Sequence, residues 1–486
     1  MIRPLLLGLV VALSLPLSSL THAQSGDQVL SPPSQTEILT PERVLAISAE
    51  SFPDILASVA QANAARGDQV AALGTFDLVF SADWFDRASG TFSGSVGEVG
   101  VTQNFRPFGA QVYGSYRKSE GTFPIYENIN FTNNGGEFKI GALFSLLRDR
   151  NFDQRRFNIR DTRLATEQAE LEVTLTKVGV QQRALNAYWR WVAAGAERNV
   201  YRELLEIAEA RAQGLEEQVR RGAMAEIAIT ENLQNILRRR KLLTEAERTY
   251  AVAANALSFY LRDDVGDLIL PKAEQLPPEA VLPELQSAVS QDNFDMSYVL
   301  ASRPELQQLR VAIDRARNKV ALGENELRPE LDLNLEISRD VGAIAEGGPT
   351  FDSTDTIIGL TFSVPLQRRA ARGKIQRAEA ELRAARLRER QVQDRIEVEL
   401  SDILINLETA LALRNIAQQE VEQADTMVAA EQKRFELGAG DFFLVNVREE
   451  RASDARISAI QAELNGRLAR TSYDAATINL DALGIN

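Results

Sequence analysis

The chain has 486 residues, a formal net charge of -14 and 44% hydrophobic residues, a composition that supports a large core or one elongated body. The acidic balance argues against nucleic acid as a partner. There is no cysteine, and the one histidine, His22, lies in a predicted secretory signal. The mature chain would therefore lack thiol and imidazole groups. We predict that it is not an enzyme and has no catalytic, cofactor-binding or metal site.

Residues 1–23 have the features of a signal peptide. Arg3 provides the positive charge, Leu5 to Leu17 form an apolar stretch, and small residues precede a predicted cleavage site after Ala23. The apolar stretch is shorter than the roughly 20 residues of a membrane-spanning helix. A retained N-terminal anchor is the alternative to cleavage. A tail of residues 24–40 is expected to follow.

The rest of the chain is expected to be two copies of one pattern. The first repeat, residues 41–262, is predicted as a helix, strands within about 76–146, a long helix at about 153–219 and a return helix at about 226–261. The second repeat, residues 303–486, is predicted as a helix, strands within about 330–364, a long helix at about 366–437 and a return helix at about 441–480. A proline-rich linker of residues 263–302 separates them.

Matching segments occur in the same order in both halves. Ile140 to Ser145 corresponds to Ile358 to Ser363, and Arg221-Gly222-Ala223 corresponds to Leu437-Gly438-Ala439. Correspondences in the same order indicate a tandem duplication.

The predicted strands alternate between apolar and polar residues. The run from Phe76 to Phe85 is one example, and Leu331 to Ile337 is another. One apolar and one polar face suit a membrane barrel, although a half-buried soluble sheet has the same pattern. Long polar connections alternate with a tight turn at Arg106 to Gly109, as expected for an outer-membrane barrel. Candidate interface aromatics are Trp84, Tyr113, Tyr116, Phe123 and Tyr126.

The two long helices carry narrow apolar stripes without an internal proline. At a rise of 1.5 Å per residue, each would be on the order of 100 Å long. Such helices are typical of coiled-coil-like assembly. If the strands lie in lipid, the six that one chain supplies leave open edges, and these require oligomerisation.

With these segments in place, the sequence resembles the TolC family of outer-membrane efflux and secretion channels. The resemblance covers nearly all of the mature chain, and the segments that carry it are Arg303-Pro304-Glu305-Leu306, Leu327-Arg328-Pro329-Glu330-Leu331, Phe362-Ser363-Val364-Pro365-Leu366 and Lys433-Arg434-Phe435-Glu436-Leu437-Gly438.

The resemblance implies an α+β membrane protein: a trimeric outer-membrane β-barrel that continues into a long α-helical coiled-coil barrel in the periplasm of a Gram-negative bacterium. It further implies a passive homotrimeric duct for tripartite efflux or type I secretion. A periplasmic adaptor (membrane fusion) protein would open the duct. An inner-membrane RND, ABC or MFS pump would energise transport through that adaptor.

The sequence departs from the family's pattern in two places. Its first half has four alternating strands where the family usually has two. Three copies would supply eighteen strands rather than twelve, unless the hairpin from Val96 to Lys118 lies outside the wall, and the pattern alone leaves both open. The first strand-to-helix corner has Leu147 where the second has Pro365.

The two helix tips are the candidate functional sites. By the resemblance they contact the adaptor, and their residues are Arg220, Arg221, Gly222, Ala223, Arg434, Phe435, Gly438, Ala439 and Gly440. Glycine also ends a helix in any ordinary turn. Candidates for a periplasmic gate are Asp441, Glu226 and Glu231, and a helix cap is the competing interpretation of Asp441.

Two other functions are weighed against the duct. A soluble periplasmic coiled-coil scaffold would explain export and the long helices, but it does not explain strands of lipid-spanning length. A carboxylate-dependent hydrolase lacks a paired acid motif. The basic run Arg238 to Lys241 is interpreted as a solvated, salt-bridged helix face rather than a nucleic-acid site.

Overall fold

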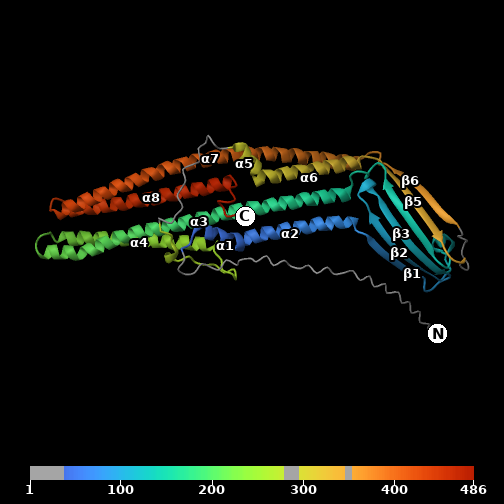
Figure 1. Cartoon of the computed structure of the whole chain (residues 1–486), viewed down its shortest axis with the longest axis horizontal. Coiled ribbons are helices and arrows are strands. Elements are labelled where there is room, and N and C mark those ends of the chain that lie inside the picture. Colours follow the sequence, from blue (N-terminus) through green and yellow to red (C-terminus); the bar gives the residue numbers. More distant parts are fainter. Residues whose placement is uncertain (1–37, 279–294, 345–352, 486) are drawn as a thin grey trace, which may run out of the picture.

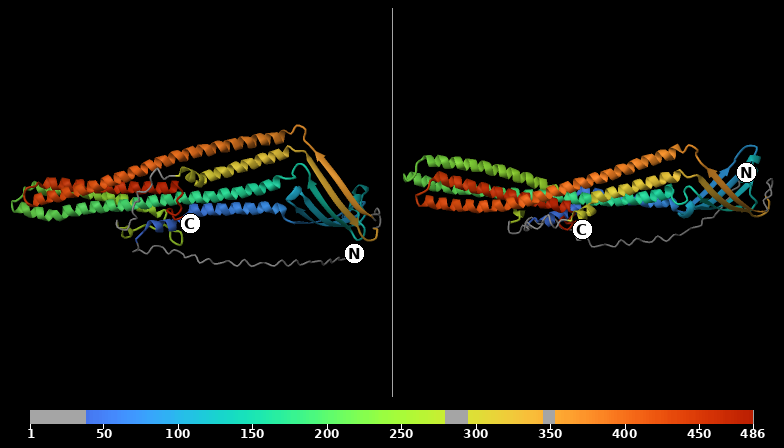
Figure 2. Two further views of the ribbon diagram at one scale, coloured as in Figure 1. Left: turned by 45° about the horizontal axis from the view of Figure 1, so that its top comes forward. Right: turned by 90° about the horizontal axis from the view of Figure 1, so that it is seen from above.

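The computed structural model describes residues 38–278, 295–344 and 353–485. The predicted signal peptide and residues 24–37 of the tail lie outside the described residues, as do residues 279–294 of the linker. The described chain is elongated, with a β-sheet at one end and two helix tips at the other (Figure 1). Two further views confirm the same narrow shape (Figure 2).

One six-stranded sheet contains strands from both halves of the chain. Its strands are β1 (Val79–Asp86), β2 (Gly94–Asn104), β3 (Gln111–Gly121), β4 (Glu137–Ser145), β5 (Glu330–Asp340) and β6 (Thr354–Ser363). Neighbours are antiparallel and follow chain order, β1-β2-β3-β4-β5-β6. The β2–β3 hairpin therefore lies within the sheet, between β1 and β4. Phe76 belongs to a 3-10 turn (η1, Gly74–Phe76) that precedes β1, so the strand begins later than its alternation suggested.

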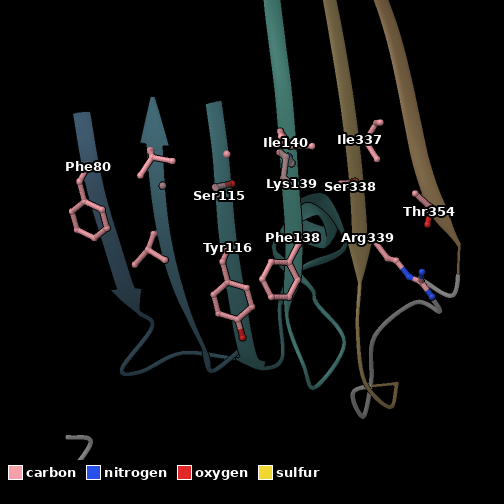
Figure 3. A pocket seen from close by; sticks show the side chains of 14 residues that line it. Phe80, Ser115, Tyr116, Phe138, Lys139, Ile140, Ile337, Ser338, Arg339 and Thr354 are labelled. Carbon is pink, nitrogen blue, oxygen red and sulfur yellow. The ribbon is translucent and has the colours of Figure 1, made fainter. Parts of the chain in front are cut away.

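The pairing register separates an apolar face from a polar face. Phe80 pairs with Val101, which lies opposite Gly114, and Gly114 in turn lies opposite Ile140 and then Ile337. Paired residues share a face. Figure 3 shows Phe80, Tyr116, Phe138, Ile140 and Ile337 around a shallow groove on the apolar face. Several of the apolar side chains are strongly exposed, among them Phe80 (68%), Trp84 (73%) and Ile358 (72%).

The polar face carries ion pairs instead. Arg117 contacts Glu137 at 2.5 Å and Lys139 lies 3.5 Å from Glu336. The hydroxyl of Tyr113 donates to Glu336 at 2.6 Å, so Tyr113 lies on this face and not among the apolar aromatics. Trp84 and Tyr116 do lie on the apolar face.

The helices repeat in the same order in both halves. The first half contains α1 (Pro41–Ser51), α2 (Pro53–Leu73), α3 (Gln154–Arg220) and α4 (Ile227–Ser258); the second contains α5 (Met296–Ser302), α6 (Pro304–Glu326), α7 (Arg369–Glu436) and α8 (Phe442–Ala476). The two long helices have 67 and 68 residues. α2 and α6 each begin with proline at the first helical position, where a missing N–H costs nothing. Similar lengths and starts support the duplication.

The two strand-to-helix corners differ in construction. Asp153 caps α3 by accepting the backbone N–H of Arg156 at 2.8 Å, whereas α7 begins after Arg368, which has φ 52° and makes no side-chain cap. The first corner is also fastened to the end of α6, because Asn325 and Asp149 exchange hydrogen bonds of 3.0 Å and 2.7 Å. These differences accompany the Leu147 and Pro365 substitution between the copies.

The main core lies halfway along the molecule, where α1, the end of α4 and the C-terminal segment pack around α3. Trp191 and Tyr188 are fully buried there, among neighbours that include Leu39, Leu257 and Leu483. The Tyr188 hydroxyl donates to the carbonyl of Leu39 at 2.9 Å. Burial raises the pKa of Tyr188 well above its usual range. The core thus joins the first and the last segments of the described chain to the middle of α3.

Among the helices within the described ranges, none combines the length and the apolar character that crossing a membrane requires.

Candidate functional site

Both helix tips end in the same hydrogen-bonded turn. At the first tip, Gly222 donates to the carbonyl of Val219 at 2.9 Å and Ala223 donates to Gln218 at 2.9 Å. At the second tip, the equivalent donors are Gly438 and Ala439, with distances of 3.0 Å and 2.9 Å. This pair of bonds defines the Schellman motif, which places a left-handed residue just after the helix. Gly222 and Gly438 both have φ 73°, a conformation that favours glycine.

The first tip is exposed and basic. Arg221 contacts Glu217 at 2.7 Å, and Arg220 pairs with the same carboxylate. Their side chains remain 73% and 75% exposed, and an ideal Cβ on Gly222 would meet nothing within 4 Å. The first tip therefore has two exposed arginine side chains and an accessible backbone at Gly222.

The second tip is partly packed. Arg434 lies 3.2 Å from the buried carboxylate of Glu431, and the ring of Phe435 lies 6.1 Å from that of Phe442. Gly440 passes close to the backbone at Phe435, where an added Cβ would lie 2.7 Å from the nitrogen atom. Gly438 and Ala439 are exposed at the apex. Both apices lie at the same end of the molecule (Figure 1).

The acidic residues near the tips differ in role. Asp441 accepts the backbone N–H of Phe443 at 3.1 Å and thereby caps α8, which supports the cap interpretation of this residue. Glu226 precedes α4, makes no side-chain cap and is exposed. Glu231 lies one turn further along α4 and is half-buried. Any ring of these acids around a threefold axis would depend on other copies of the chain.

A buried charged cluster links the two helical hairpins just behind the tips. Glu449 of α8 accepts from Arg239 of α4 at 3.1 Å, and Arg211 of α3 pairs with the same carboxylate. Arg211 also donates to Asn446 at 3.1 Å, and Gln432 of α7 donates to Glu449 at 3.3 Å. All four helices of the tip region therefore meet at one carboxylate.

The prediction of a solvated face is wrong for Arg239. Its side chain is fully buried and donates to the carbonyl of Leu204 at 2.8 Å, whereas Arg238 and Arg240 are exposed. Asn232, Arg239 and Ala246 are all buried and follow one another at seven-residue intervals. This heptad spacing was the sequence signal that could have identified Arg239 as a core position.

Comparison with known proteins gives a family match over part of the chain and a fold match over most of it. Residues 296–484 match the family described as outer membrane efflux protein. The fold is similar to those of OprN (14% identity, TM-score 0.64, 92% of this chain and 94% of that chain), CusC (14%, 0.63, 92% and 95%) and CmeC of Campylobacter jejuni (13%, 0.63, 92% and 90%). The resemblance to the TolC family is thus confirmed. Among curated proteins, none is significantly similar in sequence.

The two kinds of match cover different parts of the chain. The family's sequence match is confined to the second repeat and the end of the linker, whereas the fold match extends over both repeats. The first repeat therefore has the TolC-like architecture without the family's sequence match. Members of this family are efflux proteins rather than enzymes.

Proposed function

We propose that three copies of this chain form a passive exit duct across the outer membrane of a Gram-negative bacterium. The observation that carries the proposal is the six-stranded sheet, with one strongly exposed apolar face and one polar face, at the end of long paired helices. Lipid would cover the apolar face and water would fill the polar interior. A soluble scaffold would instead expose Phe80, Trp84 and Ile358 to water in one large patch, which soluble monomers rarely tolerate.

The open edges of the sheet support closure by other copies. In the described chain β1 and β6 each have one neighbour, and an unpaired edge in lipid leaves backbone groups unsatisfied. Because six strands alternate in direction, β6 of one copy and β1 of the next would run antiparallel. The exposed apolar residues of β1 and β6 would then join in one continuous belt. A second copy of this chain is thus the fitting partner for each edge.

The finer architecture that we propose is an eighteen-stranded wall. Three copies of a six-stranded sheet supply that number, and the β2–β3 hairpin is paired on both sides, β2 with β1 over Ser95 to Thr102 and β3 with β4 over Gln111 to Arg117. Barrel diameter grows roughly in proportion to strand number, and barrels of 16–18 strands enclose an aqueous channel. The helices α3, α4, α7 and α8 of the three copies would continue the duct as a periplasmic α-helical barrel.

The helix tips are proposed to bind a periplasmic adaptor protein. Gly222 and Gly438 present backbone rather than side chains at both apices, which permits close approach by a partner. An inner-membrane RND, ABC or MFS pump would act through that adaptor, in tripartite efflux or type I secretion. Asp441, Glu226 and Glu231 are proposed as gate residues, with Asp441 also capping α8. The Glu449 cluster would hold the two hairpins of each copy together behind the gate.

Cysteine cross-linking tests the closure of the wall, because the chain has no cysteine of its own. A cysteine at Ser81 of β1 would be combined in turn with one at Gly359, Thr361 or Ser363, all on the polar face of β6. Oxidation of intact membranes should yield dimer and trimer bands for at least one combination. A cysteine at Asn334 of β5, inside the sheet, is the matched control and should yield none. Failure of every β6 position would contradict the proposed closure.

A further inference from the structure

The connection between β3 and β4 folds back onto the polar face of the sheet. Val99 and Val101 of β2 lie on the apolar face, and Val96 lies on the opposite, polar face because it is an odd number of residues away from both. Its side chain is only 5% exposed. It packs against Phe123 and Phe131 of the connection, whose rings are also buried and lie 5.0 Å apart in a T-shaped arrangement. Phe123, considered above as an interface aromatic, is therefore an anchor of this loop. We call residues 122–136 the β3–β4 loop.

Glycine at position 94 makes room for this packing. An ideal Cβ on Gly94 would lie 2.7 Å from the ring of Phe123, far inside van der Waals contact. Gly94 has the same parity along β2 as Val96, so the clash arises on the polar face. The absence of a side chain at Gly94 therefore leaves space on the polar face for the ring of Phe123.

Polar contacts fasten the loop at several points. Ser119 and Thr132 exchange backbone-to-side-chain bonds of 3.0 Å and 2.9 Å, and the N–H of Asn133 donates to Asp340 at 2.9 Å. Gly135 donates to the carbonyl of Val341 at 2.8 Å. These contacts join the loop to the ends of β3 and β5, next to the Arg117–Glu137 ion pair of the wall.

A further ion pair joins the loop to the end of β1. Arg87, just after β1, contacts Glu127 at 2.6 Å. The neighbouring Ile125 and Tyr126 are 86% and 81% exposed, so they are directed away from the loop's own anchors. The loop is therefore held at both ends and in its middle, while the side chains of its apex, Ile125 and Tyr126, remain largely exposed.

We propose that the β3–β4 loop is a fixed constriction of the outer mouth of the duct, which excludes bulky solutes from the barrel. The inference rests on the proposed function, because the polar face becomes the lumen only when the wall closes. The loop lies at the end of the sheet away from the helices, which would be the outer end. Three loops, each with an exposed Ile125–Tyr126 apex, would narrow the wide interior of an eighteen-stranded barrel.

A reporter thiol inside the lumen tests this constriction from the outside. Ser115 lies on the polar face of β3, deeper in the wall than the loop's anchors, and the absence of cysteine makes Ser115→Cys an unambiguous reporter. Intact cells would be treated with a bulky polyethylene-glycol maleimide or with a small charged thiol reagent. The rate for the bulky reagent reports the mouth, because a reagent too large for the host's porins reaches the lumen only from outside the cell. The rate for the small reagent shows that the thiol itself is reactive in each variant.

Two variants release the loop in different ways. One replaces residues 124–131 by a short glycine-serine linker, and the other is Phe131→Ala, which removes one ring of the buried cluster. Each should raise the bulky-to-small labelling ratio by about tenfold. Phe108→Ala is the matched control, because Phe108 is 52% exposed in the turn between β2 and β3 (η2, Pro107–Gly109), at the other end of the sheet, and it should leave the labelling ratio unchanged.

The outcomes separate this inference from the proposed function. Outer-membrane fractionation and trimer size are checked first for each variant, and failure of the parent Ser115→Cys protein on both counts would refute the duct itself. With trimers present, an unchanged labelling ratio in Phe131→Ala and in the shortened loop would overturn the constriction alone. If the shortened variant does not reach the outer membrane, Phe131→Ala decides the question.

Discussion

Replacing Glu449 by glutamine is the most informative perturbation of the tip region. The change preserves shape but removes the one carboxylate that Arg239 and Arg211 share. Arg239 is fully buried and Glu449 is 3% exposed, so Arg239 cannot exchange this partner for water without a movement of the helices. The variant would leave buried guanidinium charge uncompensated.

The expected cost follows from the burial of the pair. Removing one partner of a buried ion pair typically costs about 3–5 kcal/mol. A loss of about 3 kcal/mol raises a local opening constant by on the order of 100-fold, because each 1.4 kcal/mol is a factor of ten. The matched control is Glu450→Gln, since Glu450 pairs at 3.1 Å with an Arg238 that is 62% exposed. Exposed pairs contribute about 0.2–1 kcal/mol, so the control should change opening by about fivefold or less.

Amide hydrogen exchange of the purified protein in detergent measures both variants. Exchange in α4 and α8 near the cluster should accelerate strongly in Glu449→Gln and slightly in Glu450→Gln, while the central core around Trp191 stays protected. Equal acceleration in the two variants would refute the reasoning, because it would mean that the buried carboxylate does not hold the hairpins together.

Three further predictions concern single residues. Gly222→Ala should lower the free energy of unfolding by about 1 kcal/mol, because alanine is strained at the positive φ of this residue. Gly214 lies within α3, where a Cβ also meets nothing within 4 Å, so Gly214→Ala should raise the free energy of unfolding by about 0.5–1 kcal/mol. Thermal unfolding measures both changes. Burial raises the pKa of Asp153, but hydrogen bonds and charge from Arg156 outweigh it and hold that pKa below its ordinary value. Its contribution is therefore present at neutral pH and lost as the pH falls through the lowered pKa of the folded state. Asp153→Asn should be less stable than the parent at pH 7, and this difference should shrink on acidification in denaturant titrations. Tyr188→Phe should cost about 1–3 kcal/mol in the same assay, since the buried carbonyl of Leu39 loses its donor.

Local patterns were informative where one physical cause dominates. The alternation in Leu331 to Ile337 indicated a strand with one apolar face because a pleated strand directs successive side chains to opposite sides. Gly222 and Gly438 indicated helix ends because the left-handed residue of a Schellman turn favours glycine. The long helices were indicated by uninterrupted apolar stripes, and α3 and α7 begin and end within a few residues of the expected positions.

Features that depend on contacts distant in sequence were not predictable in the same way. The β2–β3 hairpin would show the same alternation of apolar and polar residues inside the sheet or outside the wall. Only its pairing with β1 and β4 shows that the hairpin lies inside the sheet. The charged neighbours of Arg239 predict a solvated side chain, although its heptad position is buried. Phe123 and Phe131 show no strand or helix period, and their anchoring role emerges only from contact with Val96.

The central claim is a trimeric outer-membrane duct, and fractionation followed by imaging tests it most directly. The full-length chain would be expressed in a Gram-negative host, the inner and outer membranes separated, and a mild-detergent extract of the outer membrane sized and imaged. The account predicts a trimer with an eighteen-stranded wall and a helical barrel ending in the Gly222 and Gly438 tips. A soluble periplasmic protein of monomeric or dimeric size would contradict it and would favour the coiled-coil scaffold instead.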